Sequence, residues 1–185
     1  MKIDINTLSL FFSLTIFLAV LVLYIQRQTD KDMPGVSWWI LSNVLIGCYF
    51  LLIYAHAYLP TTLLHYIFGN TFLVTSSLAL FHGMLHFFDT LKKRNHALLF
   101  FGIYFLVTGI GYTFGNIIIP NAVSSILVAT FSLMSAITVR KYTSDKNKLF
   151  SNFISTTFAI NAIFFLLFSL FWILQPGGQV PTELT

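Results

Sequence analysis

The sequence predicts an all-α integral membrane protein with six transmembrane helices in an antiparallel bundle. Only 9% of its 185 residues are charged and 57% are hydrophobic, whereas a soluble domain carries about 25% charged residues. Charged residues are absent from four long blocks, residues 5–26, 33–88, 95–139 and 149–182. Because a helical span needs about 20 residues, these blocks accommodate one, two, two and one spans.

Turn residues and aromatic residues divide the blocks into individual spans. Pro34 and Gly35 precede the second span, and Trp38 and Trp39 then lie where an interfacial aromatic belt is expected. The predicted spans cover about residues 8–25, 36–55, 62–88, 97–112, 119–139 and 149–174. The connections are too short for a folded extramembrane part, so we expect a single transmembrane domain over the whole chain.

The basic residues predict the orientation of the spans. Nine of the ten follow the first, third and fifth spans: Arg27, Lys31, Lys92, Lys93, Arg94, Arg140, Lys141, Lys146 and Lys148. Cytoplasmic loops collect Lys and Arg, so we expect the N-terminus outside and these three loops inside. The start of the chain has no basic region beyond Lys2 and no small-residue cleavage sequence, which indicates a retained span rather than a signal peptide.

The composition and the absence of several motifs also exclude some classes of function. A single cysteine, Cys48, excludes a disulfide framework within the chain and a cysteine-cluster metal site. The net charge of +4 lies in short loops, where it indicates topology rather than nucleic-acid binding. The sequence contains no glycine-rich phosphate loop, no HExxH pair and no nucleophile elbow. We therefore expect a binding protein rather than an enzyme.

One short motif recurs along the chain. Phe68-Gly69-Asn70 returns as Phe114-Gly115-Asn116, 46 residues later, and basic clusters follow both copies at a similar distance. A fixed period can mark a duplication, in which case spans two–three and four–five would be equivalent hairpins. In so biased a composition, a match of three residues is also compatible with chance.

His82, His86 and Asp89 form the sharpest cluster of ionisable residues. Their i, i+4, i+7 spacing predicts one shared helix face at the inner end of the third span. Imidazole and carboxylate groups are metal ligands, and ionisable residues inside a membrane are candidates for function. The alternative is structural, with Asp89 pairing with Lys92 or Lys93 near the lipid head groups. We favour the structural interpretation, and the sequence does not identify a cofactor.

Haem binding is a separate hypothesis. Two histidines on one face of one helix cannot bind opposite sides of a haem iron. His56 and His65 lie on two different spans, but they flank the outer turn, where an interfacial position is the simpler interpretation. His96 belongs to a basic loop, where we expect it to be solvated.

Polar residues within the spans support two interpretations. In hydrocarbon, such side chains form hydrogen bonds between helices that contribute about 0.6–2 kcal/mol each. Helix packing is therefore the first interpretation, supported by the GxxxG match Gly111–Gly115 and the small face of Ser132, Ser135 and Ala136. The second interpretation is a ligand cavity inside the bundle. Its candidate lining residues are Asn43, Asn70, Ser76, Ser77 and Asn161.

The order of these motifs resembles that of a known family. The motifs are PGVSWWILSNVLIG at 34–47, the turn Leu59-Pro60, Phe68-Gly69-Asn70, Gly83, and Phe87-Phe88 before a basic loop. This order is similar to the multi-span N-terminal sensory region of bacterial diguanylate cyclases of the GGDEF type. The resemblance covers residues 1–175 and implies a multi-pass protein of the bacterial inner (cytoplasmic) membrane. It assigns no ligand role to His82 or His86.

The sequence departs from this family in two respects. It contains no GGDEF motif, so cyclase activity does not carry over to this chain. Six spans also place the C-terminal end outside, whereas a cytoplasmic output needs an odd number of spans. The resemblance therefore implies a fragment that stops before a seventh span and a signalling domain.

The first functional hypothesis is a sensory input domain in the lipid bilayer, acting as a homodimer. It would bind a small apolar or amphipathic ligand, or sense the state of the membrane, and relay this to the missing output. The second is a transporter or permease subunit, in which the hairpin repeat would form the path. The third is a metal or haem membrane protein built on the histidines.

Overall fold

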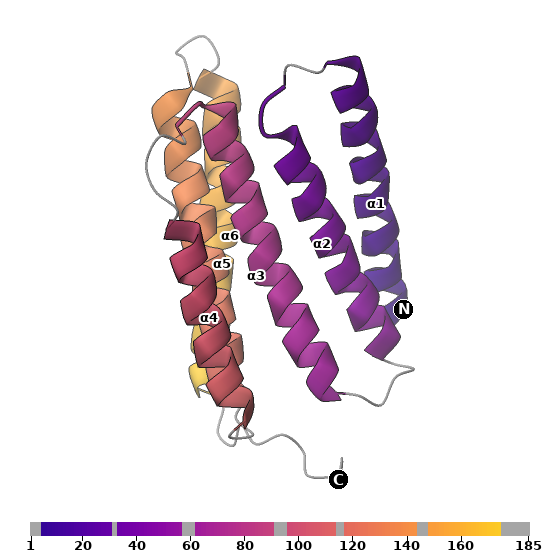
Figure 1. Cartoon of the computed structure of the whole chain (residues 1–185), viewed down its shortest axis with the longest axis vertical. Helices are drawn as coiled ribbons and strands as arrows, with labels where there is room; N and C mark the ends of the chain where they lie inside the picture. Colours follow the sequence, from indigo (N-terminus) through magenta and orange to yellow (C-terminus); the bar gives the residue numbers. More distant parts are fainter. Residues whose placement is uncertain are drawn as a thin grey trace. The chain divides into compact units, whose positions relative to one another are not determined.

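The computed structural model of the chain describes residues 5–30, 33–56, 62–90, 96–113, 117–143 and 148–174. These residues form six α-helices and no β-strand (Figure 1). The helices are α1 (Ile5–Thr29), α2 (Val36–His56), α3 (Thr62–Phe87), α4 (His96–Thr113), α5 (Ile118–Tyr142) and α6 (Lys148–Leu174). Each predicted span coincides with one of them to within about one helical turn at either end. The all-helical fold class is therefore confirmed.

Five of the described helices are long and apolar enough to cross a membrane. Their apolar parts are Asn6–Thr29, Val36–Ala55, Ile67–Phe87, Ile118–Tyr142 and Ser151–Phe171, with mean hydropathies between 1.2 and 2.6. The described apolar part of α4, Gly102–Thr113, is shorter. The fourth predicted span is therefore not among these five helices.

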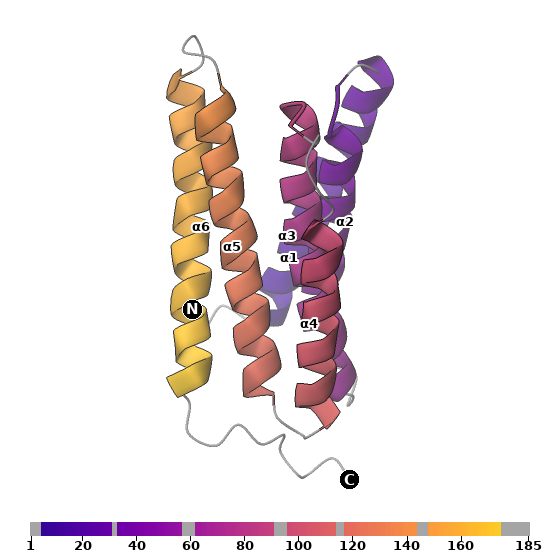
Figure 2. The same ribbon diagram turned by 60° about the vertical axis from the view of Figure 1, so that its left-hand side comes forward.

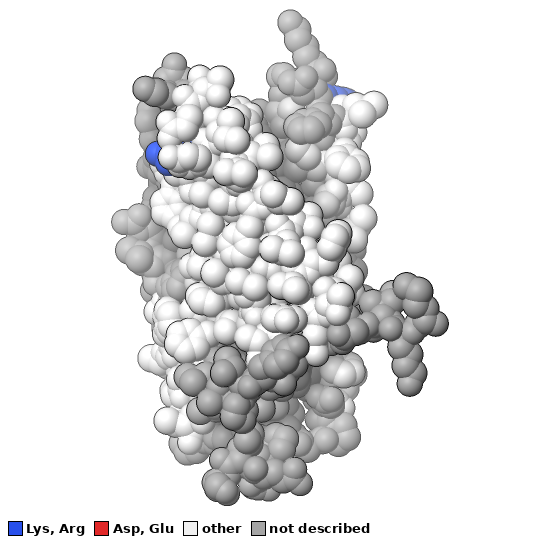
Figure 3. All heavy atoms as spheres, turned by 90° about the vertical axis from the view of Figure 1, so that its right-hand side faces the viewer, with Lys and Arg blue, Asp and Glu red and all other residues white. Residues whose placement is uncertain are grey.

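The face of the molecule shown in Figure 3 carries few charged side chains among the described residues. In the view of Figure 3, Lys and Arg atoms appear only near the upper end, and no Asp or Glu atom is visible. Large apolar side chains are widely exposed on α1 and α6; Phe11 is 65% exposed and Phe153 is 70% exposed. Water-facing surfaces rarely carry apolar patches of this extent. The helices thus indicate a protein embedded in a membrane.

The chain divides into two compact units, Met1–Leu91 and Lys92–Thr185. In the first unit, α2 packs against both α1 and α3, and the three helices run alternately up and down (Figure 1). In the second unit, α5 packs closely along α6, and α4 packs less extensively against α5 (Figure 2). That the chain forms a single transmembrane domain stays a prediction.

The end of α3 has a defined backbone geometry. The N–H of Thr90 donates to the carbonyl of Leu85 over 2.9 Å, and the N–H of Asp89 donates to that of His86 over 3.1 Å. Asp89 has a φ of 50°. These bonds and the left-handed residue form a Schellman motif, which terminates a helix by bonding its last carbonyls. Asp89 therefore lies in the terminating turn, outside the helix.

Candidate functional site

The start of α2 and the end of α3 meet at an unusually close contact, which we call the α2–α3 junction (Gly35, Trp39 and Gly83). A Cβ atom at Gly35 would overlap the backbone carbonyl of Gly83, and one at Gly83 would overlap the Trp39 indole. Gly35 also has a φ of 89°, which favours glycine. Small residues let membrane helices approach this closely, so both glycines are needed for the observed packing.

Hydrogen bonds and ring packing support the same junction. The carbonyl of Gly35 accepts the N–H groups of Trp38 and Trp39, at 3.0 and 3.2 Å. The Trp39 ring packs on Phe87 with 5.5 Å between ring centres. Its Nε1 atom is buried and has no hydrogen-bond partner among the described residues. The indole therefore contributes to the junction through its shape.

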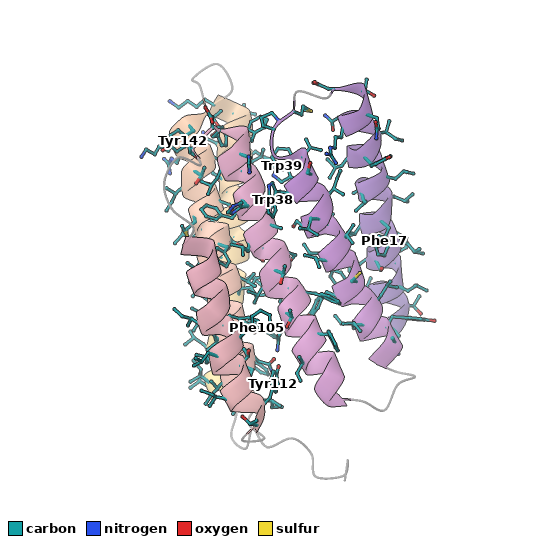
Figure 4. The ribbon with its side chains drawn as sticks, viewed as in Figure 1. Phe17, Trp38, Trp39, Phe105, Tyr112 and Tyr142 are labelled. Atoms are coloured by element: carbon teal, nitrogen blue, oxygen red, sulfur yellow. The ribbon has the colours of Figure 1, made fainter. Side chains whose placement is uncertain are left out.

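Beside the junction lies an aromatic cluster of Trp38, His82 and His86, which we call the Trp–His cluster. The ring centre of Trp38 lies 4.9 Å from that of His82 and 6.2 Å from that of His86. The two imidazole rings are 6.1 Å apart. Figure 4 labels Trp38 and Trp39 together at the beginning of α2. The i, i+4 spacing of the histidines therefore places both rings on one face of α3, as predicted.

Asp89 does not continue this face. The prediction that all three ionisable residues share one helix face is wrong for Asp89, because α3 ends at Phe87 and the chain turns at Asp89. Among the residues that the structure describes, no group of three or more His, Cys, Asp or Glu is placed to hold a metal ion. The side chains of His56, His65 and His96 lie outside the described residues, so the haem hypothesis stays a prediction.

Three of the predicted cavity-lining residues form hydrogen bonds within their own helices. Asn43 donates from its side-chain amide to the carbonyl of Trp39 over 2.8 Å. The hydroxyls of Ser76 and Ser77 both donate to the carbonyl of Leu73, at 2.8 and 3.0 Å. These bonds lie within single helices, so they neither join helices nor line a cavity, and both interpretations of these three residues stay predictions.

The other two candidates differ in their surroundings. Asn70 is half-buried on α3 in the first unit. Asn161, in the second unit, donates from Nδ2 to the hydroxyl oxygen of Ser132 over 2.8 Å and so joins α6 to α5. Since these residues belong to separate units, a cavity shared by all five candidates stays a prediction.

The small-residue face of α5 is buried, as the sequence predicted. Ser132, Ser135 and Ala136 are 4%, 1% and 7% exposed. A further bond runs from the Ser151 hydroxyl on α6 to the carbonyl of Val139 on α5 over 3.3 Å. The second half of the GxxxG match, Gly115, lies outside the described residues.

A second close contact, which the sequence did not predict, lies between α1 and α2. The ring of Phe17 occupies the space where a side chain of Gly47 would start, with ring atoms 2.9–3.2 Å from that position. Ser13 donates to the carbonyl of Gly47 over 3.1 Å. Glycine within an apolar helix was the available signal, but the sequence does not identify the helix that approaches it.

Comparison with known proteins gives no relative. No protein-family model, curated protein or solved structure matches the chain.

Proposed function

We propose that this chain is the membrane-embedded sensory input region of a signalling protein. The observation that carries the proposal is the α2–α3 junction, where two helices meet backbone to backbone at one end. The described spans contribute polar groups to packing, as in Ser13–Gly47 and Asn161–Ser132. A protein of this kind is suited to responding through changes in helix packing.

The two ends of the α2–α3 pair differ in how tightly they are packed. At the junction, a single added Cβ on Gly83 would not fit. Towards the other end, a Cβ on Gly69 would lie 3.6 Å from the Tyr49 ring, which is ordinary van der Waals contact. The tight end can therefore act as a pivot, while the looser end accommodates a ligand or follows the bilayer.

A signal is transmitted only when it stabilises one packing state more than the other. Reversing an equilibrium from 1:99 to 99:1 requires a difference of about 5.5 kcal/mol. A small apolar or amphipathic molecule between α2 and α3, or a change in bilayer thickness, is the input that we propose. Tilting of α2 about the junction is the proposed response.

In this proposal, the chain has six spans in the bacterial cytoplasmic membrane, with its N-terminus outside and its basic loops inside. It performs no catalysis itself. A homodimer would pass the response through a seventh span to a cytoplasmic GGDEF-type output, both of which the resemblance of the spans implies. The placement of Arg27 in the last turn of α1, and of Arg140 and Lys141 in that of α5, supports the orientation.

Distance measurements between spin labels test the pivot directly. In a Cys48→Ser background, one label pair replaces Leu51 and Phe68 near the looser end, where both side chains are exposed. The control pair replaces Ser37 and Asp89 at the tight end, which are also exposed. The protein is placed in phosphatidylcholine vesicles with short, intermediate or long acyl chains, and in lipids extracted from bacterial membranes.

We expect the distance at the looser end to change between these bilayers while the distance at the tight end stays constant. Constant distances at both ends in every bilayer would overturn the proposal. Equal changes at both ends would overturn the pivot, because the helices would then separate as a whole.

Orientation is tested by labelling single cysteines in intact cells. We expect a cysteine at Lys146 to be protected from a membrane-impermeant maleimide and one at Thr61 to react. The reverse pattern would contradict the proposed orientation.

A further inference from the structure

His82 and His86 have no role in the pivot, although they lie beside it. Both side chains are half-buried, and Trp38, at 36% exposed, packs against both rings. Two imidazole groups on the same side of one helix are candidates to bind one metal ion together, because neutral imidazole is the commonest metal ligand among side chains.

We propose that His82 and His86 together bind one divalent transition-metal ion of the Zn²⁺, Ni²⁺ or Cu²⁺ class, beside the indole ring of Trp38. Imidazole nitrogen suits these ions, whereas Mg²⁺ and Ca²⁺ prefer oxygen ligands. This inference does not depend on the proposed sensory function.

The separation of the two rings fits a shared ion. Metal–nitrogen bonds of about 2.0–2.1 Å place each ring centre roughly 3.2 Å from the metal. Two rings bound at a tetrahedral angle have centres roughly 5.2 Å apart. The observed separation is 6.1 Å, so the two rings must approach each other by about 1 Å, through side-chain rotation, to bind one tetrahedral ion.

The position of the pair gives the ion access to water. His86 lies in the last turn of α3, and the helix ends at Phe87 before the exposed Asp89. No third side-chain ligand is placed nearby among the described residues. Water molecules therefore complete the coordination sphere, which makes this an exchangeable site rather than a closed structural one.

Trp38 provides the means to detect binding. Its ring centre is within 6.2 Å of both imidazole rings, so a bound Cu²⁺ ion would lie close enough to quench indole fluorescence. The experiment uses the whole chain with an affinity tag that contains no histidine, in lipid nanodiscs, with Trp172→Phe so that Trp38 and Trp39 are the remaining indoles. Cu²⁺ is titrated alone, and Zn²⁺, which does not quench, is then added as a competitor.

We expect saturable quenching by Cu²⁺ that Zn²⁺ and a chelator both reverse. His82→Gln and His86→Gln should each raise the half-saturating concentration by about tenfold or more, since even loss of an outer-shell partner weakens metal sites 10–100-fold. His56→Gln, at the opposite end of α2 from Trp38, is the matched control and should leave the titration unchanged. Elution volume and helical content identify any variant that fails to fold.

Metal content gives a second readout that does not involve tryptophan. After incubation with Zn²⁺ and removal of free ions, the chain should retain one equivalent that the His82→Gln/His86→Gln variant lacks. Quenching and retained metal that are the same in this folded double variant would overturn the proposal, as would the absence of any saturable phase. Neither result bears on the spin-label distances, so the two proposals can fail separately.

Discussion

The first unit, α1–α3, and the second unit, α4–α6, hold their helices together by different means. In the first unit, glycines receive large rings, as Gly47 receives Phe17 (labelled in Figure 4) and Gly83 receives Trp39. In the second unit, α5 has a buried face of serine and alanine side chains and packs closely against α6. The comparison shows two ways in which apolar helices reach a defined register. Large rings can pack into the space left by glycines, or a helix face of small side chains can pack closely against its neighbour.

The serines of α5 behave largely as small apolar residues. The hydroxyls of Ser124 and Ser125 donate to carbonyls one turn earlier on α5, at 2.6 and 2.8 Å. Among the described residues, the Asn161 amide and the Ser151 hydroxyl both reach across from α6 to α5. In the first unit, the Trp39 and Phe17 rings instead fill the space beside glycines. We therefore expect added methyl groups to lower the free energy of unfolding of this unit more than lost hydrogen bonds do.

The largest effect is expected at the α2–α3 junction. Gly83→Ala places a methyl group on the Trp39 indole and should lower the free energy of unfolding by about 2–3 kcal/mol, since overpacking typically costs 1–3 kcal/mol. The matched control is Gly109→Ala on α4, where an added Cβ meets nothing within 4 Å. This control should be neutral or stabilising by up to about 1 kcal/mol.

Unfolding of both variants in mixed detergent micelles, followed by circular dichroism, measures the difference. Equal free energies of unfolding for Gly83→Ala and Gly109→Ala would contradict the close contact between Gly83 and the Trp39 ring.

A smaller effect is expected where α1 meets α2. Gly47→Ala should destabilise by about 1–2 kcal/mol, because its Cβ would lie 2.9–3.2 Å from the Phe17 ring, a less severe overlap than at Gly83. Combining it with Phe17→Leu should recover part of that loss, which a double-mutant cycle in the same unfolding assay detects. Strict additivity of the two changes would contradict the contact between Phe17 and Gly47.

The smallest effect is expected in the second unit. Asn161→Ala and Ser132→Ala should show a coupling of about 0.6 kcal/mol, the average for hydrogen bonds between membrane helices. A double-mutant cycle measures this coupling. Absence of coupling would remove the bond from the description of α5 and α6, and would return Asn161 to the set of candidate ligand-binding residues.

The positions of the helices could be predicted from the sequence because they follow from where charged residues occur along the chain. A charged residue inside hydrocarbon is costly, so charge-free blocks and basic clusters mark where spans begin and end. The spacing of His82 and His86 separately predicted that they share a helix face, since four residues make about one helical turn. The prediction from spacing failed for Asp89 because α3 ends before it in a Schellman motif, and the spacing of residues does not reveal where a helix ends.

Contacts between helices could not be derived in this way. Gly35 and Gly83, or Trp38 and His82, are far apart in the chain, and their meeting depends on the register and rotation of α2 against α3. Many rotations of an apolar helix bury similar apolar area, so the choice among them depends on which side chains interlock. The sequence alone thus determined that the chain is helical and apolar enough for a membrane, and where its polar and basic residues lie along the helices. The tertiary structure decided that two glycines form a junction and that Trp38 packs against two histidines, because only packing selects one register among many.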